Sequence, residues 1–292
     1  MKQWVMAAIA AMSVVAISSA QQAAVQPAEK SANVNANIKE EDKTSCPIFF
    51  GLNLDVNSAY VWRGMVYTDE PAWQPEATLG FDAKEYGRLM AIVWANFDAT
   101  GRADHSRFAG LNEIDYTVQY EVDLGDFTLG AGHIWYTFPY AEEGDWGGST
   151  REAFVSVAYN NDIVVPFAQL YYDYSVLDCL YSQVGLRKEV SLTDSFVTGA
   201  EVTLGGGNRP YTTAYFTRTY EDSFGDEVTE ELDGNFWLTD SCIALYCTYN
   251  ITENLYVGGR LAWSAIVDGA LHDNDYEHND LLWGGVSCGV EF

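Results

Sequence analysis

Beyond its first 20 residues, the sequence lacks any continuous apolar run that approaches the ~20 residues a transmembrane helix requires. It is nevertheless 48% hydrophobic and 14% aromatic, which is too apolar for a solvated, unfolded chain. Inside lipid, a backbone satisfies its hydrogen bonds only as a helix or as a closed β-barrel. A membrane location therefore implies a closed barrel, and the alternative is a soluble β-protein such as a secreted sandwich.

Basic residues are also scarce. The chain has 15 Lys and Arg against 42 Asp and Glu, and its formal net charge is −27. This charge argues against nucleic acid as a partner, because the phosphate backbone is bound through positive charge. An acidic lumen would instead attract cations, and the alternative is that most of the charge lies on solvated loops.

Cysteines are few, and none forms a C-x-x-C pair. They are Cys46, Cys179, Cys242, Cys247 and Cys288. Their odd number excludes complete internal pairing, although one disulfide would suit an oxidising compartment. Cys242, Cys247 and Cys288 fall within strand-like runs, where we expect them to be small packing residues.

The start of the chain predicts export. Lys2 precedes an apolar run at 5–17 and the small residues Ser18, Ser19 and Ala20, which is the pattern of a secretory signal peptide cleaved after Ala20. Residues 21–46 have no aromatic residue and no alternation, so we expect a disordered periplasmic leader. Residues 47–292 then form the folded part.

From Ile48 onward, polar and apolar residues alternate with period 2. Between residues 113 and 124, acidic and polar side chains occupy every odd position, and Ile, Val, Tyr and Leu every even one. A strand divides such residues between two faces, whereas a helix would scatter them. Segments of about 10 residues cover roughly 23 Å when tilted, which matches the apolar band of an outer-membrane barrel.

Segmentation by this pattern gives 13 candidate strands, but a barrel with both ends in the periplasm needs an even number. We place the surplus segment in one long outer loop at 205–239, which also contains a small hairpin. The prediction is an all-β fold, a closed antiparallel transmembrane β-barrel of about 12 strands, with 14 as the alternative count. The predicted strands span residues 48–63, 73–83, 88–98, 112–124, 127–138, 150–160, 163–175, 179–190, 195–204, 240–250, 254–266 and 281–292.

Three further features predict that the protein lies in an outer membrane of the Gram-negative type. They are the connections, the end of the chain and the positions of the aromatic residues. Short and long connections alternate, as periplasmic turns and outer loops do. The last strand alternates up to Phe292, which resembles the signal read by the barrel-insertion machinery. We expect aromatic girdles near the strand ends. The predicted girdle residues are Trp62, Trp73, Tyr120, Trp135, Tyr136, Tyr159, Tyr172, Tyr174, Tyr249, Trp263 and Trp283.

Residues 60–74 carry a resemblance to a known family. An aromatic-Arg-Gly end of the first strand is followed by Thr-Asp, Pro and a Gln that enters the second strand. The motif residues are Tyr60, Trp62, Arg63, Gly64, Thr68, Asp69, Pro71 and Gln74. This segment resembles the opening of the TorF family of proposed porins, and the resemblance implies an outer-membrane barrel with a channel role and no agreed substrate. Physically, Gly64 suits a turn that needs free backbone angles. Arg63 pairs either with Asp69 or with lumen carboxylates, or it is an interfacial anchor.

Inward-facing polar positions predict a lumen. The expected pore-lining residues are Asn53, Asp55, Asn57, Arg63, Glu76, Asp82, Glu113, Asp115, Gln119, Glu121, Asp173 and Glu201. Their carboxylates favour passive diffusion of cations or small polar solutes through a channel that is narrow at 12 strands. The alternative function is a non-conducting barrel that anchors or scaffolds partners through its outer loops.

We expect no enzymatic activity and no cofactor. The string Gly285–Gly289 matches G-x-S-x-G but lies inside the last strand, where no nucleophile elbow can form. The four histidines lack the spacing of a helical zinc site. The oxygen-rich loop at 268–280 could hold a divalent cation, although its spacing does not fit an EF-hand and a solvated loop is the simpler interpretation.

Overall fold

The computed structural model describes residues 47–98, 110–139, 148–217, 219–221, 227–229, 232, 234–272, 276 and 278–292. The predicted signal peptide and leader, residues 1–46, lie outside the described residues, as do parts of the long loops. None of the helices in the described ranges is long and apolar enough to cross a membrane.

Twelve antiparallel strands close into one barrel, as the sequence predicts. In barrel order they are β1 (Ile48–Asn57), β4 (Ala72–Asp82), β5 (Arg88–Asp98), β6 (Leu111–Leu124), β7 (Phe127–Thr137), β8 (Ser149–Tyr159), β9 (Val165–Asp173), β10 (Cys179–Thr193), β11 (Phe196–Asn208), β14 (Phe236–Asn250), β15 (Leu255–Ile266) and β16 (Asp280–Glu291). The sheet closes where β1 pairs with β16, in a register that sets Leu54 opposite Cys288. Closure leaves no unpaired strand edge, which is the condition for burying a sheet in hydrocarbon.

Alternation decides which face of each strand is buried. In β6 the odd positions from Glu113 to Glu121 are buried inside the barrel, and Tyr116, Val118 and Tyr120 are exposed on the outside. The same division holds on the closing strand, where Leu282 and Val286 are exposed. The exterior is therefore an apolar surface suited to lipid, and the polar residues are enclosed.

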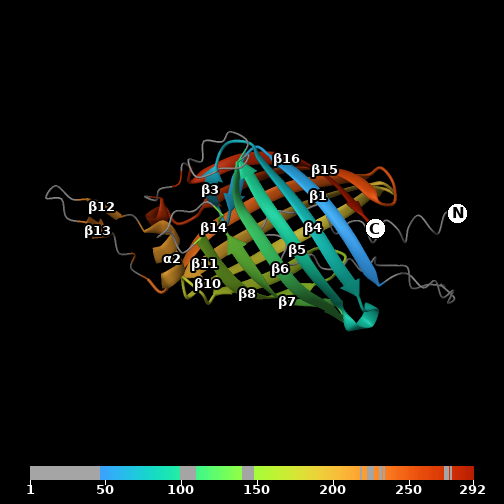
Figure 1. Ribbon diagram of the computed structural model, residues 1–292, viewed down its shortest axis with the longest axis horizontal. Coiled ribbons are helices and arrows are strands. Elements are labelled where there is room, and N and C mark those ends of the chain that lie inside the picture. The colour runs from blue at the N-terminus through green and yellow to red at the C-terminus, as the bar shows by residue number, and fades with distance from the viewer. Residues whose placement is uncertain are drawn as a thin grey trace.

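The two ends of the barrel differ (Figure 1). Turns such as η1 (Lys84–Tyr86) and the C-terminus lie at one end, which we call the short-turn end. At the other end, the long-loop end, lie the helix α2 (Arg209–Phe216) and the small hairpin of β12 (Thr219–Glu221) and β13 (Glu227–Thr229). The loop between β15 and β16 contains η3 (Gly269–Leu271). The alternation of connections is thus as expected, except that residues 174–178 make a short link at the long-loop end.

The strands depart most from their predicted boundaries in two regions. The first strand ends at Asn57 rather than at residue 63, because the chain bends at residues 58–59 and leaves the wall. The predicted loop at 205–239 does contain a hairpin, but the wall takes up its first and last residues because β11 runs to Asn208 and β14 starts at Phe236. The helix α2 within this loop was not predicted.

Eight of the predicted girdle aromatics are exposed on the outer surface, between 39% and 50% of their area. They are Trp73, Tyr120, Trp135, Tyr159, Tyr172, Tyr174, Tyr249 and Trp263. The prediction is wrong for Trp62, Tyr136 and Trp283, which are at most 6% exposed. Tyr136 and Trp283 occupy the inward-facing positions of their strands, and Trp62 lies on a segment that has left the wall.

The orientation of β6 in the membrane predicts a depth-dependent cost of charge. Val118 lies at mid-strand on the outer face, so Val118→Arg should destabilise the barrel by about 2 to 4 kcal/mol. Leu124→Arg is the matched control at the end of the same strand and should cost only about 0 to 1 kcal/mol. Denaturant unfolding from phospholipid vesicles measures both, and equal costs would contradict this placement of β6.

Candidate functional site in the barrel lumen

A hairpin from the first connection fills the long-loop half of the lumen. Its strands are β2 (Tyr60–Trp62) and β3 (Met65–Thr68), and we call residues 60–68 the lumenal hairpin. It touches walls on opposite sides. Tyr60 hydrogen-bonds to β6, whereas Val61 and Val66 pack with residues of β14, β15 and β16. Because the lumenal hairpin contacts opposite walls of the barrel, it lies inside the lumen.

The tip of the lumenal hairpin is a two-residue turn formed by Arg63 and Gly64. Trp62 pairs with Met65, and the φ angles of the two turn residues are 47° and 77°, as in a type I′ turn. Glycine is required at the second position for space as well, because a Cβ on Gly64 would lie 2.5 Å from the Cβ of Asp240. The turn thereby directs the Arg63 side chain at the wall.

Arg63 forms a buried ion pair with Glu152 of β8. Nη1 donates to Oε1 at 2.9 Å and Nη2 to Oε2 at 2.7 Å, so the pair is bidentate. The two side chains are 1% and 4% exposed. Tyr136 of β7 donates its hydroxyl to the same carboxylate at 2.9 Å. Burial is the largest influence and lowers the pKa of the Arg63 guanidinium, but Glu152, Tyr211 and Tyr136 together raise it by more, so the net pKa is well above its ordinary value.

Aromatic rings surround the Arg63 guanidinium. Its Cζ lies 4.1 Å from the ring centre of Tyr181 on β10, 4.7 Å from that of Tyr171 on β9 and 5.8 Å from that of Tyr211 on α2. Trp62, next to it in the chain, is at 4.3 Å. Cation–π attraction strengthens when the cation is desolvated, as it is here.

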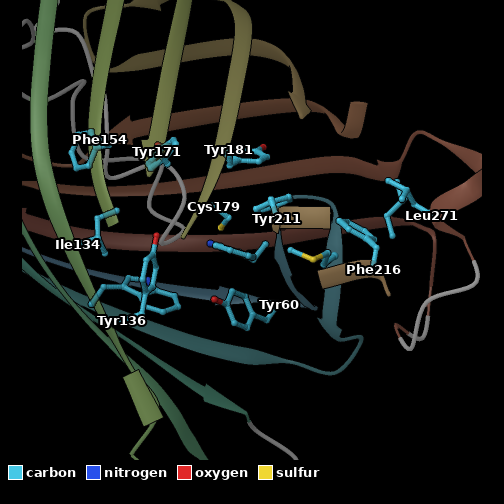
Figure 2. Close-up of a cluster of buried hydrophobic side chains, with 14 of the residues drawn as sticks. Tyr60, Ile134, Tyr136, Phe154, Tyr171, Cys179, Tyr181, Tyr211, Phe216 and Leu271 are labelled. Atoms are coloured by element: carbon cyan, nitrogen blue, oxygen red, sulfur yellow. The ribbon is translucent and has the colours of Figure 1, made fainter. Parts of the chain in front are cut away.

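These rings belong to a larger buried cluster, which we call the aromatic plug. Figure 2 shows side chains from several strands and from α2 meeting in the lumen. The aromatic plug consists of Tyr60, Trp62, Met65, Ala72, Trp94, Ile134, Tyr136, Phe154, Tyr171, Cys179, Tyr181, Tyr211, Phe216, Ile266 and Leu271. Since these residues are at most 6% exposed, the long-loop half of the barrel is filled in this conformation.

The helix α2 covers the lumenal hairpin. Asn208 caps it by accepting a hydrogen bond from the backbone N–H of Tyr211 at 3.2 Å, and Pro210 starts its first turn. The capped helix directs Tyr211 inward, with its ring centre 5.2 Å from that of Tyr181. Tyr215 lies 5.4 Å from Trp62, so the helix also contacts the hairpin.

Carboxylates of β6 lie beside the lumenal hairpin. The Tyr60 hydroxyl donates to Glu113 at 2.7 Å, and burial followed by the charge of Glu113 raises the pKa of Tyr60 well above its ordinary value, so it stays a neutral donor. Asp115 is 3% exposed, and neither of its carboxylate oxygens has a hydrogen-bond partner among the described residues. It lies within electrostatic range of Glu113 and Glu152.

Amide side chains link four adjacent strands across the inner wall. Asn57 donates to Gln74 at 2.7 Å, Gln74 to Asn96 at 2.9 Å, and Asn96 to Asn112 at 2.8 Å. Each amide is both donor and acceptor, so a chain of amides satisfies buried polar groups without adding charge. Gln74, the last residue of the family motif, is thus an inner-wall residue.

The short-turn half of the lumen is polar rather than aromatic. Arg88 pairs with Glu121 at 3.2 Å, and Arg187 lies 4.0 Å from Glu201. Tyr256 donates to Asn53 at 2.7 Å. The interior therefore changes from charged and polar at one end to aromatic at the other.

Most predicted pore-lining residues are enclosed by the barrel. Asn53, Asp55, Asn57, Arg63, Glu113, Asp115, Gln119, Glu121, Asp173 and Glu201 are buried. Glu76 is half-buried on the same face of β4. Asp82 is different, because it is exposed at the end of β4, where its carboxylate accepts a hydrogen bond from the Lys84 N–H at 2.7 Å and caps the turn.

The rest of the family motif lies at the base of the lumenal hairpin. Thr68 accepts from the backbone N–H of Glu70 at 3.1 Å, and Pro71 is exposed just before β4. Asp69 lies 3.3 Å from His278 of the last long loop rather than beside Arg63. Of the two pairings expected for Arg63, the structure thus has the one with a lumen carboxylate.

Sequence reasoning did not identify Glu152, Tyr136, Tyr171, Tyr181 and Tyr211 as lumenal residues, and it assigned Tyr136 to the lipid girdle. The first four face inward on strands that were placed correctly. The alternation of inward and outward positions could therefore have identified Glu152, which is charged. The tyrosines gave no such signal, because aromatic residues are equally expected on the lipid face. Tyr211 belongs to the unpredicted helix.

The described cysteines, Cys179, Cys242, Cys247 and Cys288, are all free. Within the described ranges, no group of three or more His, Cys, Asp or Glu residues could hold a metal ion. Parts of the loop at 268–280 lie outside those ranges, so its cation site stays a prediction. Asp268 itself caps η3 through the Ala270 N–H at 3.0 Å.

The buried ion pair predicts a non-additive double-mutant cycle. Arg63→Met and Glu152→Gln should each destabilise the protein by about 3 to 5 kcal/mol, because each leaves a buried charged group without its partner. The double variant should lose clearly less than the sum, since it removes both charges. Denaturant unfolding of the four proteins checks this, and strict additivity would show that the two side chains do not interact.

Comparison with solved structures finds outer-membrane channels and porins. The COG4313 outer membrane channel from Pseudomonas putida F1 superposes with a TM-score of 0.50 at 8% identity, over 88% of this chain and 100% of that chain. The NanC porin gives 0.47 at 12% identity, over 82% and 98%. The KdgM porin gives 0.42 at 7% identity, over 84% and 98%. At such low identity the likeness to the COG4313 channel concerns the fold alone.

A closed barrel of 12 strands with an apolar exterior is an outer-membrane protein of the Gram-negative type. No curated protein matches the sequence. A family model described as "Bacterial protein of unknown function (Gcw_chp)" matches residues 41–229, which is more than half of the chain and includes the whole lumenal hairpin. The chain therefore belongs to the Gcw_chp family.

Proposed function

We propose that this protein is an outer-membrane channel for cations and small polar solutes, and that the lumenal hairpin closes its long-loop half in the conformation described here. The observation that carries the proposal is an enclosed interior rich in carboxylates behind an apolar exterior. A barrel that only anchors partners has no need of Glu113, Asp115 and Glu121 in its interior, where desolvation makes each costly.

The charges of the interior favour cations over anions. Glu121 and Glu201 each have an arginine beside them, and Glu152 has Arg63. Glu113 instead accepts from a neutral tyrosine, and Asp115 has no hydrogen-bonding partner in the described residues. A lumen with surplus negative charge concentrates cations by electrostatic focusing.

The motif at 60–74 supports a narrower family assignment. Its aromatic-Arg-Gly element forms the tip of the lumenal hairpin, so the motif describes the closing element itself. We therefore assign the protein to the TorF porins within this proposal. We also propose that residues 1–20 export it and that Phe292, 71% exposed at the end of the chain, takes part in recognition by the barrel-insertion machinery.

A non-conducting structural barrel is the second candidate, because the aromatic plug fills the long-loop half. The two candidates differ in what happens when the lumenal hairpin is released. A channel should open, whereas a structural barrel should stay silent or lose its fold.

Single-channel recording in planar bilayers separates them. We expect the wild-type protein to open rarely and Arg63→Ala to open often, because loss of the ion pair frees the hairpin from β8. The open state should prefer potassium to chloride, and Glu113→Gln with Asp115→Asn should reduce that preference severalfold. If neither wild type nor Arg63→Ala, both shown to be folded by heat-modifiable gel mobility, gives ion-conducting steps, the channel proposal is wrong.

A further inference from the structure

The wall around Arg63 has the composition of a receptor for a guanidinium group. Glu152 offers two carboxylate oxygens in one plane, at 2.9 and 2.7 Å from the two guanidinium nitrogens. Tyr171 and Tyr181, from two other strands, contribute ring faces at 4.7 and 4.1 Å. We call Glu152, Tyr171, Tyr181 and Tyr211 the guanidinium cage.

The three wall residues of the guanidinium cage, Glu152, Tyr171 and Tyr181, are held in place without help from Arg63. Tyr136 donates to Glu152 at 2.9 Å. Tyr171 donates to Gln169 at 3.1 Å, and Tyr181 donates to Asp240 at 3.1 Å. These bonds fix the carboxylate and both rings to the strands, so the cage is preorganised by the barrel wall.

Arg63, by contrast, does not belong to the wall. It lies at the tip of the lumenal hairpin, in a connection between β1 and β4, and reaches the cage from across the lumen. Because Arg63 is covalently tethered through the hairpin, it occupies the cage at a high effective concentration. A free solute with the same chemical group would compete for the same contacts.

The cage discriminates by shape as well as by charge. A guanidinium is flat, donates two parallel hydrogen bonds to a carboxylate and stacks on rings, whereas an ammonium or a metal ion does none of these in combination. The surroundings also tolerate further positive charge, because Asp115 is buried near Glu152 with neither oxygen hydrogen-bonded in the described residues.

We propose that the guanidinium cage is a binding site for the guanidinium group of a small cationic solute, which displaces Arg63 from Glu152 and releases the lumenal hairpin. This deepens the proposed function by naming the class of solute that the closed channel recognises. Binding itself does not require that the barrel conducts.

The test uses Arg63→Ala, which empties the cage while leaving its walls intact. The purified full-length variant in detergent, with folding checked by heat-modifiable mobility, is titrated by calorimetry with millimolar guanidinium chloride and, separately, with sodium chloride. We expect saturable guanidinium binding at least about tenfold tighter than sodium binding, since sodium cannot form the bidentate charge-assisted contact with Glu152. Wild type should bind much more weakly, because Arg63 occupies the cage.

Two control variants locate the site. Arg63→Ala with Glu152→Gln should lose the binding, because the bidentate acceptor is gone. Arg187→Ala removes a different lumenal arginine, which lies 4.0 Å from Glu201 and 5.7 Å from the ring centre of Phe167, and should gain no binding because its site lacks the bidentate contact. Guanidinium binding no stronger than sodium binding in Arg63→Ala, or equal binding in the Glu152→Gln double variant, would overturn the proposal.

If Arg63→Ala does not fold alone, refolding with millimolar guanidinium or sodium makes the same test. A rise in the folded fraction with guanidinium alone supports the site, and no difference refutes it. The result is separable from the channel proposal. A conducting barrel whose Arg63→Ala variant ignores guanidinium refutes only the site, whereas a silent barrel that binds it refutes only the channel.

Discussion

The buried ion pair between Arg63 and Glu152 is the interaction on which the interior of this barrel depends. It joins a connecting segment to the wall at a point where both charges are removed from water, at 1% and 4% exposure. A buried pair of this kind adds little net stability by itself, but losing one partner is costly. The pair therefore acts mainly as a positional constraint, and the rings of the aromatic plug pack around the place that it sets.

The barrel wall follows from a different constraint, the need to satisfy every backbone hydrogen bond within hydrocarbon. Closure of β1 against β16 satisfies this requirement and places no restriction on which side chains fill the interior. The interior is accordingly divided, with aromatic packing under α2 and polar pairs toward the short turns. A solute entering from the short-turn end would meet charged groups first and the underside of the lumenal hairpin afterwards. Access through the long-loop end depends on moving that hairpin.

The wall could be predicted from the sequence because lipid imposes a strict alternation, as in β6, where every predicted face is correct. The interior could not, for reasons visible in single residues. Tyr60 and Trp62 continue the alternation of β1, so nothing local reveals that the chain bends at residues 58–59 and turns inward. Tyrosines such as Tyr171 fit a lipid girdle as well as a lumen. The inward position of Glu152 follows from the alternation of its strand. Its pairing with Arg63 does not, because Arg63 lies 89 positions away and the two meet only in the closed barrel.

The central claim is that residues 60–68 lie inside the lumen and are held there by Glu152. Its most direct test is the chemical accessibility of Met65→Cys, in a background whose native cysteines are replaced by Ser, to a membrane-impermeant maleimide applied to proteoliposomes. Met65 is 0% exposed, so the account predicts protection when Glu152 is present and rapid labelling when it is Gln. Equally rapid labelling in both proteins would contradict it.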